Sequence, residues 1–263
     1  MFWVILRSSR RVPEGREWLI EQLRSGPAWR HLFFEALPRN AKNVDTPLAL
    51  MTALQESGKP VSQKEIAPYL DFLISTNRVD FAYNAWLQFL PKGQLESIGL
   101  LTNAGFESKP SGLPFDWQIG NGVNALAEIV PLGAGSAEHA LHIGFSDGRV
   151  QFPEVSQIVL LAPGRYRLEG KLRGTIVGKR GLRWQLRCAS GSRQVLAETD
   201  MLLGQSQQWR LFTLEAEVHQ LEECRGQTLR LFHDSRSASE ELLSGEVWFN
   251  DLRLQRVQRT AVQ

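Results

Sequence analysis

The first third of the chain carries apolar residues at the spacing of amphipathic helices. Apolar side chains recur every three or four residues over 18–37, 66–73 and 81–89, which is the period of a helix with one buried face. Thr46-Pro47 predicts a helix start, because Thr caps helices and Pro suits the first helical position. Ser62 and Glu65 have the spacing of a capping box. We therefore expect residues 1–97 to form a region of short helices.

The pattern changes from about Gly99 onward to alternating apolar and polar residues. The clearest alternation covers 141–145, 166–172, 182–188 and 212–218, and it is typical of strands with one buried face. Turn residues such as Pro163-Gly164 separate the segments. We expect residues 98–257 to form an antiparallel β-sandwich or jelly roll, with a tail at 258–263. The fold class is thus α+β with two domains.

Composition excludes several function classes. The 263 residues are 43% hydrophobic and 22% charged, which is ordinary for a globular protein. A net charge of +2 argues against a nucleic-acid partner. Two cysteines are too few for a disulfide framework or a four-cysteine zinc site. Cys188 and Cys224 are expected either to pair in an oxidising compartment or to remain separate thiols.

The start of the chain has three interpretations. An apolar run over 1–6 precedes Arg7, Arg10 and Arg11, and it falls short of the roughly 18 residues of a membrane span. The run is either the end of a membrane anchor, a short strand or disordered start, or the edge of a fragment. An anchored protein would have an extracytoplasmic location, periplasmic or membrane-associated.

Short motifs at both ends of the strand-rich part resemble a known family. The part opens with Leu100–Glu107, reading LLTNAGFE, is followed by Trp117, and closes with Gly245–Leu254, reading GEVWFNDLRL. Over about 98–257 it resembles the galactose-binding-like, carbohydrate-binding jelly rolls of bacterial glycoside hydrolases, which open "N-G-G-F-E … W" and close "DD-V-x-L". Ala104 and Asn250 depart from that pattern.

The resemblance implies a structural calcium ion held by Glu107 and Asp251. Calcium needs six to eight oxygen ligands, and the loss of an acid at Asn250 weakens the set. The alternative is that both carboxylates accept backbone N–H groups where the terminal strands meet.

The helical region resembles tetratricopeptide hairpins, and the best-matching piece is Pro68–Leu90. The resemblance implies a protein partner for the helices. A generic helical bundle is the alternative, because no clean 34-residue period is visible in the sequence.

Sugar binding needs flat aromatic rings beside planar polar groups. Trp209 has the opposite parity to the apolar residues of its strand, so it is expected off the core, whereas Trp117, Trp184 and Trp248 are expected in it. The predicted ligand face joins this tryptophan to outward polar residues: Trp209, His142, Arg167, Glu169, Arg183, Gln185 and Arg187. The many basic residues over 165–187 suit either an acidic polysaccharide or pairing with acidic strands.

Enzyme motifs are missing from the sequence. It contains no G-x-S-x-G elbow, H-E-x-x-H pair or P-loop, and no spacing singles out an acid pair among Glu107, Asp116 and Glu138. We therefore expect no catalytic residue and a non-catalytic glycan-binding or scaffolding protein, with a role in bacterial polysaccharide assembly or export. The alternatives are a protein-interaction module that has lost sugar binding and part of a glycan-active enzyme.

Overall fold

A computed structural model describes residues 13–96, 98–220 and 222–257. The chain divides into two compact units, one up to Gln88 and the other from Phe89 onward. The expected domain boundary at 97/98 falls nine residues later. Among the described residues, no helix has the length and apolar character needed to cross a membrane. The apolar run at 1–6 lies outside the described residues.

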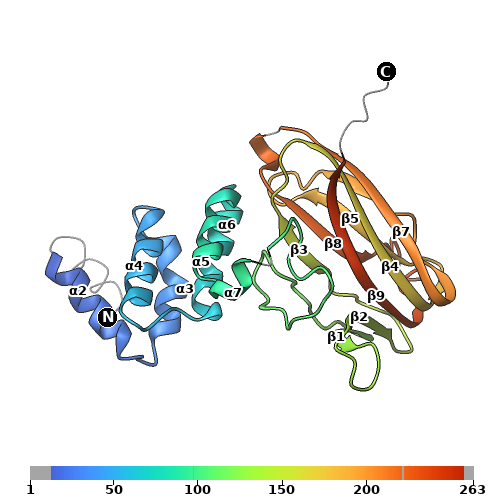
Figure 1. Cartoon of the computed structure of the whole chain (residues 1–263), viewed down its shortest axis with the longest axis horizontal. Helices are drawn as coiled ribbons and strands as arrows, with labels where there is room; N and C mark the ends of the chain where they lie inside the picture. The colour runs from blue at the N-terminus through green and yellow to red at the C-terminus, as the bar shows by residue number, and fades with distance from the viewer. Residues whose placement is uncertain (1–12, 97, 221, 258–263) are drawn as a thin grey trace. The chain divides into compact units, whose positions relative to one another are not determined.

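Over residues 13–88, the first unit has five helices of similar length. They are α2 (Pro13–Arg24), α3 (Arg30–Asn40), α4 (Asp45–Glu56), α5 (Gln63–Ser75) and α6 (Val79–Gln88) (Figure 1). Helix α5 packs against α3 and α6, while α4 contacts α2. The starts of α3 and α5 are 33 residues apart, from Arg30 to Gln63, and those of α4 and α6 are 34 apart, from Asp45 to Val79. Successive helix pairs thus begin at similar intervals along the chain.

A partly buried ion pair joins α3 to α5. Glu65 accepts the backbone N–H of Ser62 at 2.8 Å, as the capping box predicts, and it also accepts Nε of Arg30 at 2.7 Å. The same guanidinium donates to the carbonyls of Leu23 and Pro60. The carboxylate therefore both begins α5 and holds α3 beside it.

The start of the helix predicted at Thr46-Pro47 lies two residues earlier in the chain. Helix α4 begins at Asp45, and its N-cap position is Val44, which makes no side-chain cap. Asp45 in the first turn supplies the negative charge that the helix dipole favours there.

The second unit is an antiparallel β-sandwich preceded by the short helix α7 (Lys92–Leu95). One sheet has the order β1-β2-β9-β4-β7 and the other the order β3-β8-β5-β6 (Figure 1). The strands are β1 (Ala125–Pro131), β2 (His139–Phe145), β3 (Val155–Val159), β4 (Gly164–Gly178), β5 (Leu182–Cys188), β6 (Val195–Glu198), β7 (Gly204–Val218), β8 (Gln227–His233) and β9 (Leu243–Val257). Helices followed by an antiparallel sandwich are the predicted fold class.

The core lies between the two sheets, and it is formed by the apolar residues that alternate with polar ones along the strands. Buried residues of both sheets form one cluster, in which the Trp184 ring contacts Trp117, Phe212 and Phe249. The expectation that Trp117 and Trp184 are core residues is confirmed, since both are fully buried. Because inward positions fill this cluster, the residues between them face outward on each sheet.

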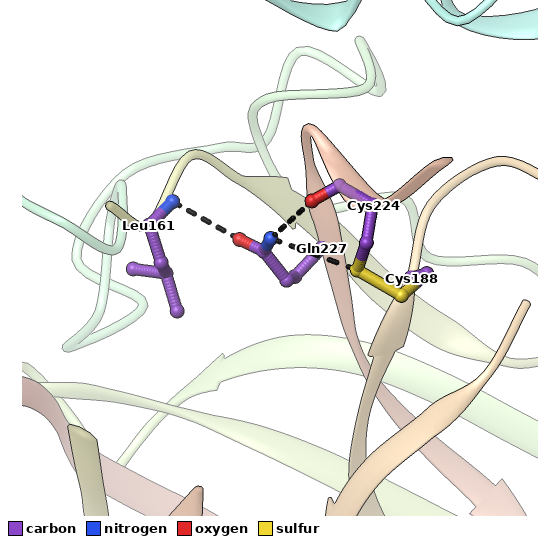
Figure 2. The surroundings of a disulfide bond; sticks show 4 residues. All are labelled: Leu161, Cys188, Cys224 and Gln227. Atoms are coloured by element: carbon purple, nitrogen blue, oxygen red, sulfur yellow. Dashed lines mark hydrogen bonds between the residues drawn. A yellow bond between two sulfur atoms is a disulfide. The ribbon is translucent and has the colours of Figure 1, made fainter. Parts of the chain in front are cut away.

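Cys188 and Cys224 form a disulfide across a sequence separation of 36 residues (Figure 2). Beside it lies the fully buried amide of Gln227. This amide accepts the backbone N–H of Leu161 at 3.0 Å and donates to the carbonyl of Cys224 at 3.0 Å. The bond and the amide together fix the segment between β7 and β8 to the end of β5.

Candidate functional site

A row of polar and aromatic side chains crosses the outer face of the five-stranded sheet, with one residue from each strand. The register places Glu128 opposite His142, His142 opposite Trp248, and Trp248 opposite Arg173. Trp209 of β7 completes the row beside Arg173. Five strands about 4.8 Å apart give the row a length of about 19 Å.

The members of the row stand side by side above the sheet. The His142 and Trp248 rings are stacked with centroids 4.8 Å apart and planes at 28°, close to the spacing of neighbouring strands. The guanidinium carbon of Arg173 lies 4.8 Å from the Trp209 ring centroid and 5.8 Å from that of Trp248. Since β9 lies between β2 and β4, His142 and Arg173 flank Trp248 from opposite sides.

A glycine allows the two central strands to approach closely beside the row. Gly174 has φ of +124°, and a Cβ atom there would lie 2.2 Å from the carbonyl oxygen of Glu246. A larger residue would therefore force β4 away from β9 and separate Arg173 from Trp248.

The expectation that Trp248 is a core residue is wrong. Val247 and Phe249 take the two inward positions and are fully buried, so Trp248 between them faces outward. Trp209 lies outside the core cluster and is partly exposed, as its parity predicts. Because β7 is the edge strand, no further strand of the sheet lies beyond Trp209, and one side of its ring faces away from the row.

His142 lies between two carboxylates. Its Nδ1 is 3.6 Å from Oε1 of Glu128, and its Nε2 is 3.4 Å from Oε2 of Glu246. Both acids are about half exposed, whereas the imidazole is largely covered. The row is therefore acidic around His142, where one carboxylate comes from β1 and the other from β9, and cationic at Arg173.

A cavity of about 540 Å³ adjoins the acidic end of the row. Glu107, Glu128 and His139 line it, together with the rings of Phe106 and Trp117. Its volume falls within the range of ligand sites, and half of the residues that line it are polar or charged. Glu128 belongs both to the cavity and to the row, so the two features are continuous.

The structure does not bring the predicted ligand residues together into one site. Trp209 and His142 belong to the row. Arg167 and Glu169 share its face, but they pair with each other at 3.1 Å, and Arg167 lies about 20 Å along β4 from Arg173 by the strand rise. These two therefore flank the row at a distance.

The other three predicted residues face outward on the opposite sheet. Gln185 is buried and bonds Arg230 and Glu198. The other charged residues of this face form ion pairs. Arg183 pairs with Glu198 and Asp234, and Arg187 and Arg230 both pair with Glu154. Burial lowers the pKa of Arg187 from its ordinary value. Pairing between strands, one of the two interpretations of the basic run, is confirmed for this face.

The two predicted calcium ligands each contact other groups of the chain. Oδ2 of Asp251 is 2.7 Å from the Lys171 ammonium and Oδ1 is 2.8 Å from Arg253; the Lys171 hydrogen bond, chiefly, lowers the pKa of the carboxyl. Glu107 lies 3.3 Å from Nδ1 of His139 and 3.4 Å from its backbone nitrogen. Within 13–96, 98–220 and 222–257, no group of three or more His, Cys, Asp or Glu side chains is placed to hold a metal.

Asp116, one of the three acids considered for catalysis, has a structural role. Its carboxylate accepts the backbone N–H of Ser111 and that of Trp117, each at 2.7 Å. The sequence pattern did not single out Glu128, Arg173, Glu246 and Trp248 as ligand residues. The cross-strand register is the signal that places them together.

No protein-family model and no curated protein matches the chain. Among solved structures, a family 4 carbohydrate-binding module is similar, with 14% identity over 60% of this chain and 99% of that chain and a TM-score of 0.41. A family 61 module in complex with β-1,4-galactotriose is 19% identical over 61% of this chain and 100% of that chain, with a TM-score of 0.38. The CBM22-1 xylan-binding domain of Paenibacillus barcinonensis Xyn10C is 11% identical over 55% of this chain and 87% of that chain, with a TM-score of 0.35.

Proposed function

We propose that the second unit is a non-catalytic glycan-binding module and that its ligand lies along the row on the five-stranded sheet. The observation that carries the proposal is the alignment of Trp248, Arg173 and Trp209 with His142 on one outer face. Sugars are bound by ring faces and by planar donors and acceptors, and this row supplies both kinds of group.

Because of the stacking, the members of the row contact a ligand through different parts of their side chains. Because Trp248 is flanked on both sides, it meets a ligand with its ring edge and its indole N–H. Trp209, with one side facing away from the row, offers the ring face on which a pyranose packs. Leu211, which is 71% exposed on the same strand, extends the apolar surface there. Glu128 and Glu246, on either side of His142, supply acceptors for sugar hydroxyls.

The helical unit is proposed to bind a protein partner. Two helix pairs that repeat after 33 and 34 residues support a tetratricopeptide-like array, in which neighbouring repeats stack to bury a continuous core. A partner on the helices and a glycan on the sandwich would suit polysaccharide assembly or export.

The disulfide supports a location outside the cytoplasm. Disulfides persist in oxidising compartments and are rare in the cytosol, and Cys188 and Cys224 are paired. An extracytoplasmic location agrees with contact to an exported or surface polysaccharide.

A glycan array tests the proposal with three variants of the full chain. Trp209→Ala and Trp248→Ala should each weaken binding about tenfold or more, because truncating a central aromatic contact costs about 2 kcal/mol. Trp18→Ala is the matched control, since Trp18 is 52% exposed in the helical unit and its loss should leave binding unchanged. Thermal unfolding of each variant confirms that it folds.

Two results would overturn the proposal. Absence of binding by the wild-type chain would favour the protein-interaction alternative. Release of new reducing ends from a bound polysaccharide would favour the enzyme alternative.

A further inference from the structure

Arg173 differs from the other basic residues that face outward on β4. Each of those residues has a carboxylate within 4 Å: Arg165 has Glu217 at 3.9 Å, Arg167 has Glu215 at 3.7 Å, and Lys171 has Asp251 at 2.7 Å. Within the part of the chain that the structure describes, Arg173 has no such partner. Its contacts are the rings of Trp209 and Trp248.

The two indole rings hold the guanidinium in place without using its hydrogen bonds. A guanidinium packed on aromatic faces keeps its N–H donors in its own plane, and Arg173 is partly exposed. The planar fork of donors matches a carboxylate, which it binds with two parallel hydrogen bonds. Neighbouring rings also exclude water, so such a pair gains more than an ion pair on an open surface.

The surroundings of His142 disfavour a negatively charged ligand group. Glu128 of β1 and Glu246 of β9 flank His142, so an anionic ligand group placed there would meet two carboxylates. An extended ligand along the row thus has one favourable place for a negative charge, at Arg173, and a place for neutral hydroxyls around His142.

From this polarity we infer that the bound glycan is acidic and that Arg173 binds the carboxylate of one of its sugar units. The inference rests on the proposed glycan-binding function and names the substrate class of that site. The carboxylate lies over β4 between Trp209 and Trp248, and the neighbouring units extend toward His142 and the cavity at β1.

The experiment compares acidic polymers with their neutral counterparts. Oligogalacturonate, alginate and hyaluronan are each titrated into the full chain beside the same polymer after reduction of its carboxyl groups to alcohols. At least one acidic form should bind about tenfold more tightly than its reduced form, because a hydrogen bond to a charged group contributes on the order of 1.4 kcal/mol or more. Dextran sulfate serves as a polyanion without carboxylates and should bind more weakly.

Variants at two neighbouring residues assign the effect. Arg173→Gln should remove the preference for the acidic form over the reduced form, and Arg173→Lys, which lacks the planar fork, should restore only part of that preference. Lys171→Gln is the matched control, because Lys171 is already paired with Asp251, and it should keep the preference.

Each remaining outcome overturns the inference. Equal binding of acidic and reduced forms, a preference that survives in Arg173→Gln, or tighter binding of dextran sulfate contradicts a carboxylate site at Arg173. Binding of neutral polysaccharides alone would overturn this inference and leave the proposed function standing. Binding of no polysaccharide would overturn both.

Discussion

Removing the disulfide is expected to destabilise the sandwich strongly. In the double variant Cys188→Ala/Cys224→Ala, the unfolded chain regains the freedom of a loop spanning 36 residues. The chain-entropy relation gives about 4 kcal/mol for a loop of this length. A loss of that size lowers the melting temperature of a domain of this size by about 8–16 °C.

The measurement has to report on the sandwich alone, because the chain has two units. Native-state hydrogen exchange followed on peptides from β5 and β8 gives the free energy of opening for the strands that the bond joins. Dithiothreitol should bring the wild-type protein to the level of the variant and leave the variant unchanged. A difference below about 1 kcal/mol between the oxidised wild type and the variant would refute the reasoning.

Four further changes test other parts of the structure. Gln227→Ala should cost about 1–3 kcal/mol for each backbone partner that it leaves unsatisfied, measured by urea unfolding; a cost near zero would contradict the bridging role. Arg30→Leu should cost about 3 kcal/mol because it leaves Glu65 without its cation, and adding Glu65→Leu should recover much of the loss. Folding lowers the pKa of Asp251 below its unfolded value of 3.8, so the ionised carboxylate should stabilise the fold above pH 3.8. This stabilisation should be lost as the pH falls through the folded-state pKa. The stability of Asp251→Asn should therefore equal that of the wild type at the acid end of a pH series of unfolding measurements. Calcium should raise the melting temperature by less than about 1 °C relative to EDTA, because a ligand stabilises a folded protein only when it binds to it. A larger increase would support a calcium site at Glu107 and Asp251.

The sequence predicted those features that depend on local pattern. Alternation identified β4, β5 and β7, and the spacing of Ser62 and Glu65 identified the start of α5. The parity of Trp209 placed it off the core. Each of these depends on residues close together in the chain, where periodicity and capping chemistry act directly.

The features that the sequence did not predict depend on pairing between distant segments. Arg183, Gln185 and Arg187 alternate as cleanly as the residues of β4, and nothing local shows that they belong to the other sheet. In β9, the run Val247-Trp248-Phe249 is apolar throughout, so its inward positions become visible only when β2 and β4 are aligned beside it. Asp251 has φ of +54°, a conformation uncommon for residues other than glycine, and this irregularity follows from the shifted register with β4.

The strand order also decides when the surface of the sandwich is completed during synthesis. β9 follows the other strands of the sandwich in the chain, yet it lies in the middle of its sheet, between β2 and β4. A nascent chain can fold its helices early, because their contacts are local, whereas the gap between β2 and β4 stays open until β9 leaves the ribosome. His142 and Arg173 are then separated by an empty strand position, and Trp248 arrives with the strand that fills it. A product truncated before β9 therefore displays unpaired strand edges, which chaperones and proteases recognise, and only a chain that includes β9 presents the row.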